Sequence, residues 1–362
     1  MDTEEIISQL ITKNIIEYDK NFGYRIANDY SLPIFPMSYG FEDVAISQQK
    51  NVCSSRLEVS TKAEFIRGHY LEKPLIAANM STVVNADFII KLYKMGAFGI
   101  IHRAQSNESI IEDIKKVAKE CDLVAASIGI DDSQFDLAKE MILAGCNVLT
   151  IDVANSYTDR TIELVKKIKE YSKETQIIVG NTTHTGILEE LSDYIDAVKV
   201  GIAQGYACET KNTAGCTEKQ FSAVYKFKDL SKRLGIPVIS DGSIREPADV
   251  VKAIGAGANS VMAGKIFAAC PESAAEEVLV GEQLHTLKKV YAGMASRYVQ
   301  DRWKGGLRKG TCPEGCVKYL DIGESSEKLL ERYMGALRSG ITYSGAHDVP
   351  SFQNNVQFVR FK

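Results

Sequence analysis

The sequence predicts a (β/α)8 barrel, in which eight parallel strands close into a cylinder with helices outside. Three observations predict it. From residue 74 onward, short apolar runs recur about every 25 residues, stretches with helical periodicity lie between them, and most runs end in a polar residue or glycine. A repeated strand–helix alternation is typical of a parallel sheet with crossover helices, and eight strands favour closure into a barrel.

The eight apolar runs supply the predicted strands. They lie at residues 74–79, 98–102, 123–129, 147–153, 176–181, 196–201, 237–242 and 260–264. Between them, apolar residues at helical spacing predict helices, of which the clearest lie at 87–96, 109–120 and 160–173.

The chain of 362 residues is predicted to form a single barrel domain. We expect an N-terminal extension over 1–73, the barrel core over 74–290, a C-terminal flap or lid over 291–316 and a closing segment over 317–362. The flap prediction rests on five glycines, a proline and several cations in one stretch, because long irregular insertions in barrels usually bind or cover ligands.

Composition excludes several classes of protein. The net charge is −4, with 43 Lys and Arg against 47 Asp and Glu, so the chain lacks the excess of cations that binds nucleic acid. No apolar stretch is long enough to span a membrane, and the acidic start MDTEEIISQL is unlike a secretory signal. The eight cysteines are scattered, which favours reduced thiols and a cytoplasmic location.

The ends of the runs are the first candidates for a functional site. A polar residue or glycine closes most runs, and barrel enzymes build their sites at the C-terminal ends of the strands. The alternative is that each such residue caps the next helix or turn. The positions are Asn79, His102, Asp152, Asn181, Gly201, Asp241 and Gly264.

Cys208 is the candidate nucleophile. It lies in the glycine-rich segment GIAQGYAC, directly after the sixth run, and Thr210 follows two residues later. A cysteine at the mouth of a barrel acts as a nucleophile when its thiolate is stabilised, whereas a structural cysteine is the alternative. Cys312 and Cys316 form an isolated C-x3-C pair with no second pair or histidine cluster, so we expect no zinc site there.

The segments after the seventh and eighth runs resemble a phosphate cradle. In barrels these loops bind phosphate through backbone N–H groups, and Gly242 and Gly264 allow close approach of the backbone. Lys265 adds a cation there, with a solvated surface lysine as the alternative. Asp241 is placed to accept hydrogen bonds from a ribose diol.

Six motifs in the same order carry a resemblance to a known family. They are PLIAANMSTV, TIDVANSY, VKVGIAQGYACETK, ISDGSIREPADVVKAIGAGANSVMAG, YAGMAS and ITYSGA. The chain from about residue 40 to 362 resembles inosine-monophosphate dehydrogenase and guanosine-monophosphate (GMP) reductase. The resemblance implies a barrel that binds a purine nucleotide at the strand ends, a cysteine that attacks purine C2, and a nicotinamide cofactor that exchanges hydride at that carbon.

The resemblance also implies the roles of particular residues. The implied catalytic residues are Cys208, Thr210 and Glu314. The nicotinamide cofactor is expected to be NADPH, and the residues implied to bind it are Asp152, Asn155 and Asn181. Backbone carbonyls of Ala203, Gly205 and Cys208 take the family's positions for a monovalent cation such as K+. The residues implied for the nucleotide are Asp241, Gly242, Ser243, Gly264, Lys265, Met294, Ala295 and Ser296.

Between the two branches, the sequence favours the reductase. The dehydrogenases usually carry a regulatory domain inserted in the barrel, and no segment here has that size. The segment from Gly293 to Glu314 aligns with the reductase pattern without a gap, including Gly305 and Gly306. The expected activity is therefore NADPH-dependent reductive deamination of GMP to IMP and ammonia, in a homotetramer.

Several residues depart from the family pattern, mostly around the nucleotide. The loop Gly-Pro-Gly-Ser is replaced by 203–206, which removes a serine that touches phosphate. The other departures are Ser81, Lys211, Ser243 and Ala295. Three alternatives therefore remain open: a relative that acts on a modified purine or deazapurine nucleotide, a dehydrogenase without its regulatory domain, and a nucleotide-binding barrel without catalytic activity.

Overall fold

The computed structural model describes residues 16–19, 23–26, 37–281 and 286–361, and the chain divides into two units, 1–39 and 40–362. In the first unit, strand β1 (Ile16–Asp19) pairs antiparallel with β2 (Gly23–Ile26). The elements below belong to the second unit. The subdivision that the sequence predicts, into segments 1–73, 74–290, 291–316 and 317–362, stays a prediction.

Eight parallel strands form the barrel in the order β7-β6-β13-β12-β11-β10-β9-β8. The two ends of this order meet through a parallel bridge between Ile101 and Ala126, so the barrel is nearly closed. Seven of the predicted apolar runs contain one of these strands, the run 176–181 ends one residue before β10 does, and the predicted fold class is confirmed. The strands are β6 (Leu75–Ala77), β7 (Phe98–Gly99), β8 (Ala125–Ile128), β9 (Val148–Asp152), β10 (Gln176–Thr182), β11 (Ala197–Val200), β12 (Val238–Asp241) and β13 (Ser260–Ala263).

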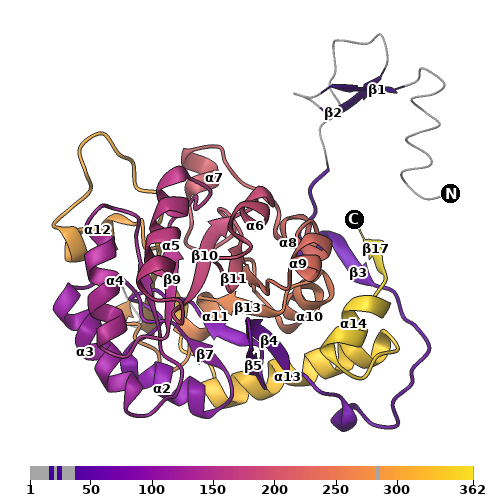
Figure 1. The fold of residues 1–362 in the computed structure, drawn as a ribbon. Coiled ribbons are helices and arrows are strands. Elements are labelled where there is room, and N and C mark those ends of the chain that lie inside the picture. Colours follow the sequence, from indigo (N-terminus) through magenta and orange to yellow (C-terminus); the bar gives the residue numbers. More distant parts are fainter. Residues whose placement is uncertain (1–15, 20–22, 27–36, 282–285, 362) are drawn as a thin grey trace. The chain divides into compact units, whose positions relative to one another are not determined.

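Helices follow the strands and surround the barrel (Figure 1). The three helices predicted from periodicity are confirmed to within two residues, and Asn85, Ser106 and Thr158 cap the N-termini of α2, α3 and α5 with their side chains. In the described ranges, no helix is long and apolar enough to cross a membrane. The helices are α2 (Ala86–Lys94), α3 (Asn107–Ala118), α4 (Gln134–Leu143), α5 (Asp159–Tyr171), α6 (Gly186–Leu191), α7 (Thr210–Thr213), α8 (Gln220–Tyr225), α9 (Lys228–Leu234), α10 (Pro247–Gly255) and α11 (Lys265–Ala268).

A hairpin fills the N-terminal end of the barrel. Strands β4 (Ala63–Ile66) and β5 (His69–Leu71) pair antiparallel, and their buried Phe65 joins one apolar cluster with side chains from all eight barrel strands. The rings of Phe65 and Phe98 lie 4.8 Å apart. Because this end is packed with apolar side chains, polar chemistry is left to the opposite end.

After the barrel, the chain forms a second sheet, further helices and a last strand. Strands β14 (Glu277–Val280), β15 (Thr286–Ala292) and β16 (Val317–Asp321) form an antiparallel sheet. Helices α13 (Ser326–Tyr343) and α14 (Val349–Asn355) follow. The last strand, β17 (Phe358–Arg360), pairs with β3 (Val44–Ile46), which lies between two short 3-10 helices, η1 (Phe41–Asp43) and η2 (Arg56–Glu58).

The predicted flap contains a helix, so the expectation of irregular structure throughout 291–316 was wrong. Helix α12 spans Arg297–Lys304. Ser296 caps it by accepting the Val299 N–H at 3.3 Å, and Gly305 ends it in the left-handed conformation at φ 71°. Both signals are present in the sequence, but a serine and a glycine in a glycine-rich segment also predict a loop.

Two glycines of α13 offer a matched test of the packing. A Cβ on Gly340 would overlap the Cγ1 atom of Val251 on α10, whereas a Cβ on Gly335 would meet no atom within 4 Å. Gly340→Ala is expected to lower the free energy of unfolding by about 1–3 kcal/mol through overpacking. Gly335→Ala is expected to raise it by about 0.5–1 kcal/mol through helix propensity. Chemical denaturation measures both, and equal effects would contradict the packing of α13 on α10.

Candidate active site

The C-terminal ends of the strands surround a cavity of about 650 Å³, a size typical of sites for small molecules. Its walls come from the strand ends, from the segment 201–219, called here the Cys loop, and from residues that follow β15. Sixteen residues predicted from the sequence line it: Asn79, Asp152, Asn181, Gly201, Ala203, Gly205, Cys208, Thr210, Asp241, Gly242, Ser243, Gly264, Lys265, Met294, Ala295 and Glu314.

Cys208, Thr210 and Glu314 form a hydrogen-bonded chain in this cavity. Cys208 Sγ lies 3.3 Å from Thr210 Oγ1, and Thr210 Oγ1 donates to Glu314 Oε2 at 2.7 Å. Because the threonine hydrogen points to the carboxylate, its oxygen is left to accept from the thiol. The arrangement can therefore move a proton between the reacting centre and a carboxylate.

Backbone hydrogen bonds hold the end of the flap beside the Cys loop. The Glu209 N–H donates to the Glu314 carbonyl at 2.8 Å, and the Cys316 N–H donates to the Ala207 carbonyl at 3.0 Å. On the other side, the Gly293 N–H donates to the Cys316 carbonyl at 3.1 Å. The end of the flap, at 314–316, therefore lies between the Cys loop and the end of β15. This position brings Glu314 to Thr210.

Lys199 lines the cavity and is a candidate site residue that the sequence analysis missed. It lies on β11 with its side chain 2% exposed, and its Nζ is 3.1 Å from Asp152 Oδ1 and 3.0 Å from Asp241 Oδ2. It also donates to Asn181 Oδ1, and Asn181 Nδ2 donates to Asp241 Oδ2 at 3.0 Å. Four neighbouring strands, β9 to β12, thus each contribute one residue to a single buried polar cluster, called here the Lys199 cluster.

Charges within the Lys199 cluster shift the pKa values of its members. Burial by itself lowers the pKa of Lys199, but the charges of Asp241 and Asp152 outweigh burial and hold that pKa above its ordinary value. Burial alone raises the pKa of Asp152, but Lys199 and Arg103 outweigh it and hold that pKa below its ordinary value. Both side chains are therefore charged at neutral pH.

Arg103 is a second residue that the sequence analysis missed. It lines the cavity, and its Nε is 3.7 Å from Asp152 Oδ2. Its guanidinium lies over the ring of Trp303 from α12, with 5.1 Å from Cζ to the ring centroid. The neighbouring His102, a predicted candidate, is absent from the cavity wall. Burial lowers the pKa of His102 to about 4, and its Nδ1 accepts the Ala104 N–H at 3.2 Å.

Besides His102, two of the predicted site residues do not line the cavity. Asn155 is exposed, and its Oδ1 accepts the Tyr157 N–H at 3.2 Å within its own turn. Ser296 is 1% exposed and caps α12. Their predicted contacts, with the cofactor and with the purine nucleotide, stay predictions.

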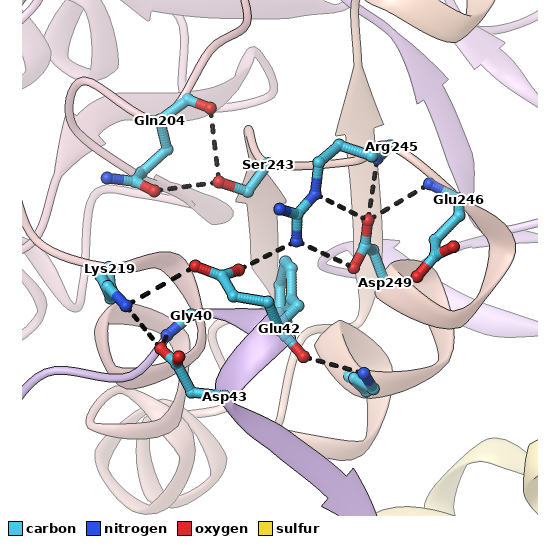
Figure 2. Close-up of polar contacts among 11 residues, drawn as sticks. Gly40, Glu42, Asp43, Gln204, Lys219, Ser243, Arg245, Glu246 and Asp249 are labelled. Carbon is cyan, nitrogen blue, oxygen red and sulfur yellow. Dashed lines mark hydrogen bonds and ion pairs between the residues drawn. The ribbon is translucent and has the colours of Figure 1, made fainter. Parts of the chain in front are cut away.

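The backbone at one end of the cavity has a glycine-like conformation at two positions that are not glycine. Ala203 and Ser243 both have φ 59°, a left-handed conformation that disfavours residues with a Cβ by roughly 1–2 kcal/mol. The two segments hold each other, because the Ser243 N–H donates to the Gln204 carbonyl at 2.9 Å. Figure 2 shows the Ser243 hydroxyl between the carbonyl and the side-chain oxygen of Gln204, the latter at 2.9 Å.

A network of ion pairs lies beside this end of the cavity (Figure 2). Arg245 donates to Glu42 Oε2 at 2.9 Å and also contacts both oxygens of buried Asp249. Lys219, at the end of the Cys loop, lies 2.6 Å from Asp43 and 3.6 Å from Glu42. The residues just before β3 are thus connected to both ligand-facing segments, the Cys loop and the turn after β12.

All eight cysteines are free thiols. Cys312 is exposed and Cys316 is partly buried. Over the described part of the chain, no group of three or more His, Cys, Asp or Glu side chains could hold a metal ion.

The family model for the IMP dehydrogenase / GMP reductase domain matches residues 38–362. The chain belongs to this family. It is 32% identical over 338 residues to a GMP reductase of Enterobacter sp. (strain 638), which covers 90% of this chain and 95% of that protein. In three dimensions it resembles a crystal structure of a variant of GMP reductase from Trypanosoma brucei in complex with guanosine 5′-monophosphate. The TM-score is 0.83 at 22% identity, over 91% of this chain and 96% of that one.

A dehydrogenase is also among the relatives, and it weakens one argument from the sequence. The chain is 29% identical over 378 residues to an inosine-5′-monophosphate dehydrogenase of Borreliella burgdorferi, covering 88% of this chain and 93% of that protein. A family member named as a dehydrogenase therefore matches this chain over nearly its whole length. The absence of a large inserted segment does not by itself distinguish the two branches.

Lys199→Met tests whether the Lys199 cluster supports the fold. The variant leaves Asp152 and Asp241 without their shared cation, and breaking a buried pair costs about 3–5 kcal/mol of unfolding free energy. The matched control is Lys94→Met, which removes an exposed lysine 2.6 Å from Glu120 and is expected to leave stability nearly unchanged. Urea denaturation followed by circular dichroism compares them. Equal stability of the two variants would contradict the cluster.

The pH dependence of stability tests the charge of Asp152. Its pKa is depressed in the folded state, so its contribution is present above the unfolded-state pKa of about 3.9 and is lost as the pH falls through the folded-state pKa. Wild type is therefore expected to lose more unfolding free energy between pH 6 and pH 3 than Asp152→Asn does. An identical loss in both proteins would show that the pKa of Asp152 is not depressed.

Proposed function

We propose that the chain catalyses NADPH-dependent reductive deamination of GMP to IMP and ammonia. The observation that carries this proposal is the chain of contacts from Cys208 Sγ through Thr210 Oγ1 to Glu314 Oε2 in the cavity at the strand ends. Family membership and the likeness to proteins named GMP reductase support the same activity.

The proposed reaction replaces the 2-amino group of the purine by hydrogen. Overall, GMP, NADPH and two protons give IMP, NADP+ and ammonium. The Cys208 thiolate adds to C2, the amino group takes up a proton and leaves as ammonia, and the thiolate leaves again once C2 carries its new hydrogen. Thr210 and Glu314 suit the proton transfer, because an amine leaves readily only when it is protonated.

The walls of the cavity supply groups for the ribose and the phosphate. Lys199 and Asn181 both contact Oδ2 of Asp241, which leaves Oδ1 for the ribose hydroxyls. Gly242, Ser243, Gly264 and Lys265 lie further along the same wall, where backbone N–H groups and the lysine ammonium suit a phosphate. The opposite side of the Lys199 cluster, at Asp152, is assigned to the cofactor.

NADPH is the cofactor of this proposal, and Asp152, Asn155 and Asn181 would hold it. One structural observation fits a polar ligand there: Arg103 Nε is buried and has no hydrogen-bond partner among the described residues. When bound, NADPH supplies the hydride that C2 receives. The part of the protein is to hold the Asp152 side of the cavity charged and ordered through Lys199 and Arg103.

A monovalent cation such as K+ is proposed at the backbone carbonyls of Ala203, Gly205 and Cys208. The Gly205 carbonyl accepts the Cys208 N–H at 3.0 Å, so it already belongs to a tight turn, and a carbonyl oxygen keeps a second lone pair for a cation. We further propose the homotetramer and the cytoplasmic location that the family resemblance and the sequence predict.

One observation favours a second candidate function. Ala295 stands in the cavity wall where the reductase pattern has a serine beside the base, while the Cys208 relay is complete. A reductase for a modified purine or a deazapurine nucleotide would combine these two features, because its base would not need that hydroxyl.

Turnover with GMP and NADPH, followed by the fall in absorbance at 340 nm, tests the proposed function. Cys208→Ala is expected to abolish turnover, since the covalent step is lost. Thr210→Val and Glu314→Gln are expected to lower kcat by about 10²–10⁴-fold, the usual contribution of acid–base catalysis. Cys216→Ala, at an exposed cysteine on the same loop, is the control and is expected to retain activity.

The outcomes of this assay separate the candidates. Turnover of IMP with NAD+ but not of GMP with NADPH would overturn the proposal in favour of a dehydrogenase. Turnover of a deazapurine or modified purine nucleotide alone would favour the second candidate. Absence of turnover with every purine nucleotide would contradict both catalytic functions, and full activity of Cys208→Ala would contradict the covalent step.

A further inference from the structure

We propose that Tyr206 is a positioning residue that holds the ammonium group of Lys265 at the phosphate end of the cavity, where Lys265 binds the 5′-phosphate of the nucleotide. The proposal rests on the proposed function insofar as the ligand is a purine 5′-mononucleotide. It deepens that function by naming how this chain recognises the phosphate after losing the serine of the family pattern.

The geometry joins three segments that are distant in the sequence. Lys265 Nζ lies 4.3 Å from the centroid of the Tyr206 ring, well within the range of a cation–π interaction. The Tyr206 ring is stacked on the ring of Tyr291, at 6.4 Å between centroids and 25° between planes. Tyr291 is 3% exposed on β15, so it forms a fixed base for the half-exposed Tyr206.

Among the described residues, Lys265 has no carboxylate within ion-pair distance, a feature that it shares with Lys211 in the same cavity wall. Arg103, Lys199 and Arg245 also line the cavity, and each forms an ion pair with an aspartate or glutamate. Within the described part of the chain, no Asp or Glu lies within ion-pair distance of Lys265 Nζ. The Lys265 ammonium is stacked on a ring and has no carboxylate that neutralises it. It is therefore suited to bind an anionic group of a ligand.

The surroundings of Lys265 favour a phosphate as that anion. Gly264 precedes it, and a Cβ there would overlap the Tyr291 hydroxyl, so the backbone and this phenol lie against each other. Burial raises the pKa of Tyr291, so the phenol stays protonated and can donate. Among the described residues, the hydrogen-bond acceptor of this hydroxyl is the sulfur of Met80, at 3.7 Å, which is a weak acceptor. An ammonium and a phenol that both lack a strong acceptor match the oxygens of a phosphate monoester.

In this proposal Tyr206 affects the binding of the phosphate although it does not touch it. A lysine stem is flexible, and fixing it on binding a ligand costs conformational entropy. Holding the ammonium over a ring beforehand removes part of that cost without neutralising the charge. The hydroxyl of Tyr206 plays no part, so phenylalanine is expected to replace tyrosine and leucine is not.

Calorimetric binding of GMP and of guanosine, measured without NADPH, tests the proposal. Lys265→Gln is expected to raise the Kd for GMP roughly tenfold or more, the effect of losing a charge-assisted contact. Tyr206→Leu is expected to raise it roughly three- to thirtyfold, and Tyr206→Phe to leave it unchanged. None of them should change the Kd for guanosine, which has no phosphate.

The control is Tyr225→Leu. It removes a tyrosine of matching exposure, 51% against 50%, that also carries a lysine over its ring but lies outside the cavity wall. The double variant Tyr206→Leu/Lys265→Gln is expected to be no weaker than Lys265→Gln alone, because Tyr206 acts through the lysine. If Tyr206→Leu fails to fold, the Tyr206→Phe and Lys265→Gln comparison of GMP with guanosine still decides whether the lysine binds the phosphate.

Three results would overturn the proposal. They are an unchanged Kd for GMP in Lys265→Gln, an equal loss of affinity for guanosine, and additive losses in the double variant. The test is independent of the reaction, because binding is measured without the cofactor. Wild type that binds GMP through Lys265 but does not turn it over contradicts the proposed function alone. Turnover of GMP with no effect of Lys265 contradicts this inference alone.

Discussion

The Lys199 cluster is the interaction on which the rest of the site depends. One buried ammonium lies between two carboxylates from β9 and β12, and the strands between them contribute Lys199 itself and Asn181. Removing a charge from such a cluster leaves another buried and unpaired, so its members are tied to one another. The cluster therefore sets the positions of Asp241 and Asp152 together, although we assign them to different ligands.

The proposed catalytic relay from Cys208 to Glu314 depends on a second constraint, the packing of the flap against the Cys loop. Glu314 belongs to the flap and not to the barrel, and it reaches Thr210 because backbone hydrogen bonds hold the flap against the Cys loop. The same region brings Trp303 over Arg103, which pairs with Asp152. The flap thus contacts the site at two points, one at the Cys208 relay and one beside the Lys199 cluster.

The sequence predicts the barrel well because a parallel strand between helices must be apolar on both faces. Each strand is therefore a short apolar run in the sequence, and each predicted run overlaps a strand. The sequence did not indicate a buried role for Lys199, because a lone lysine in DAVKVG resembles a surface residue. Its role depends on carboxylates from strands that are remote in the sequence. The contacts of Arg103 could not be predicted either, because its partners Asp152 and Trp303 come from segments that are remote in the sequence.

Some residues that depart from the family pattern contact one another, so these departures are not independent changes. Gln204 and Ser243 stand at two separate departures, yet they bond to each other through backbone and side chain. Ala203 and Ser243 stand where the family pattern has glycine, and both adopt the left-handed conformation, at a cost of roughly 1–2 kcal/mol each. Tyr206, a third departure, lies on the same loop as Gln204 and contacts Lys265. These contacts favour a different set of contacts to the proposed phosphate over loss of the nucleotide site.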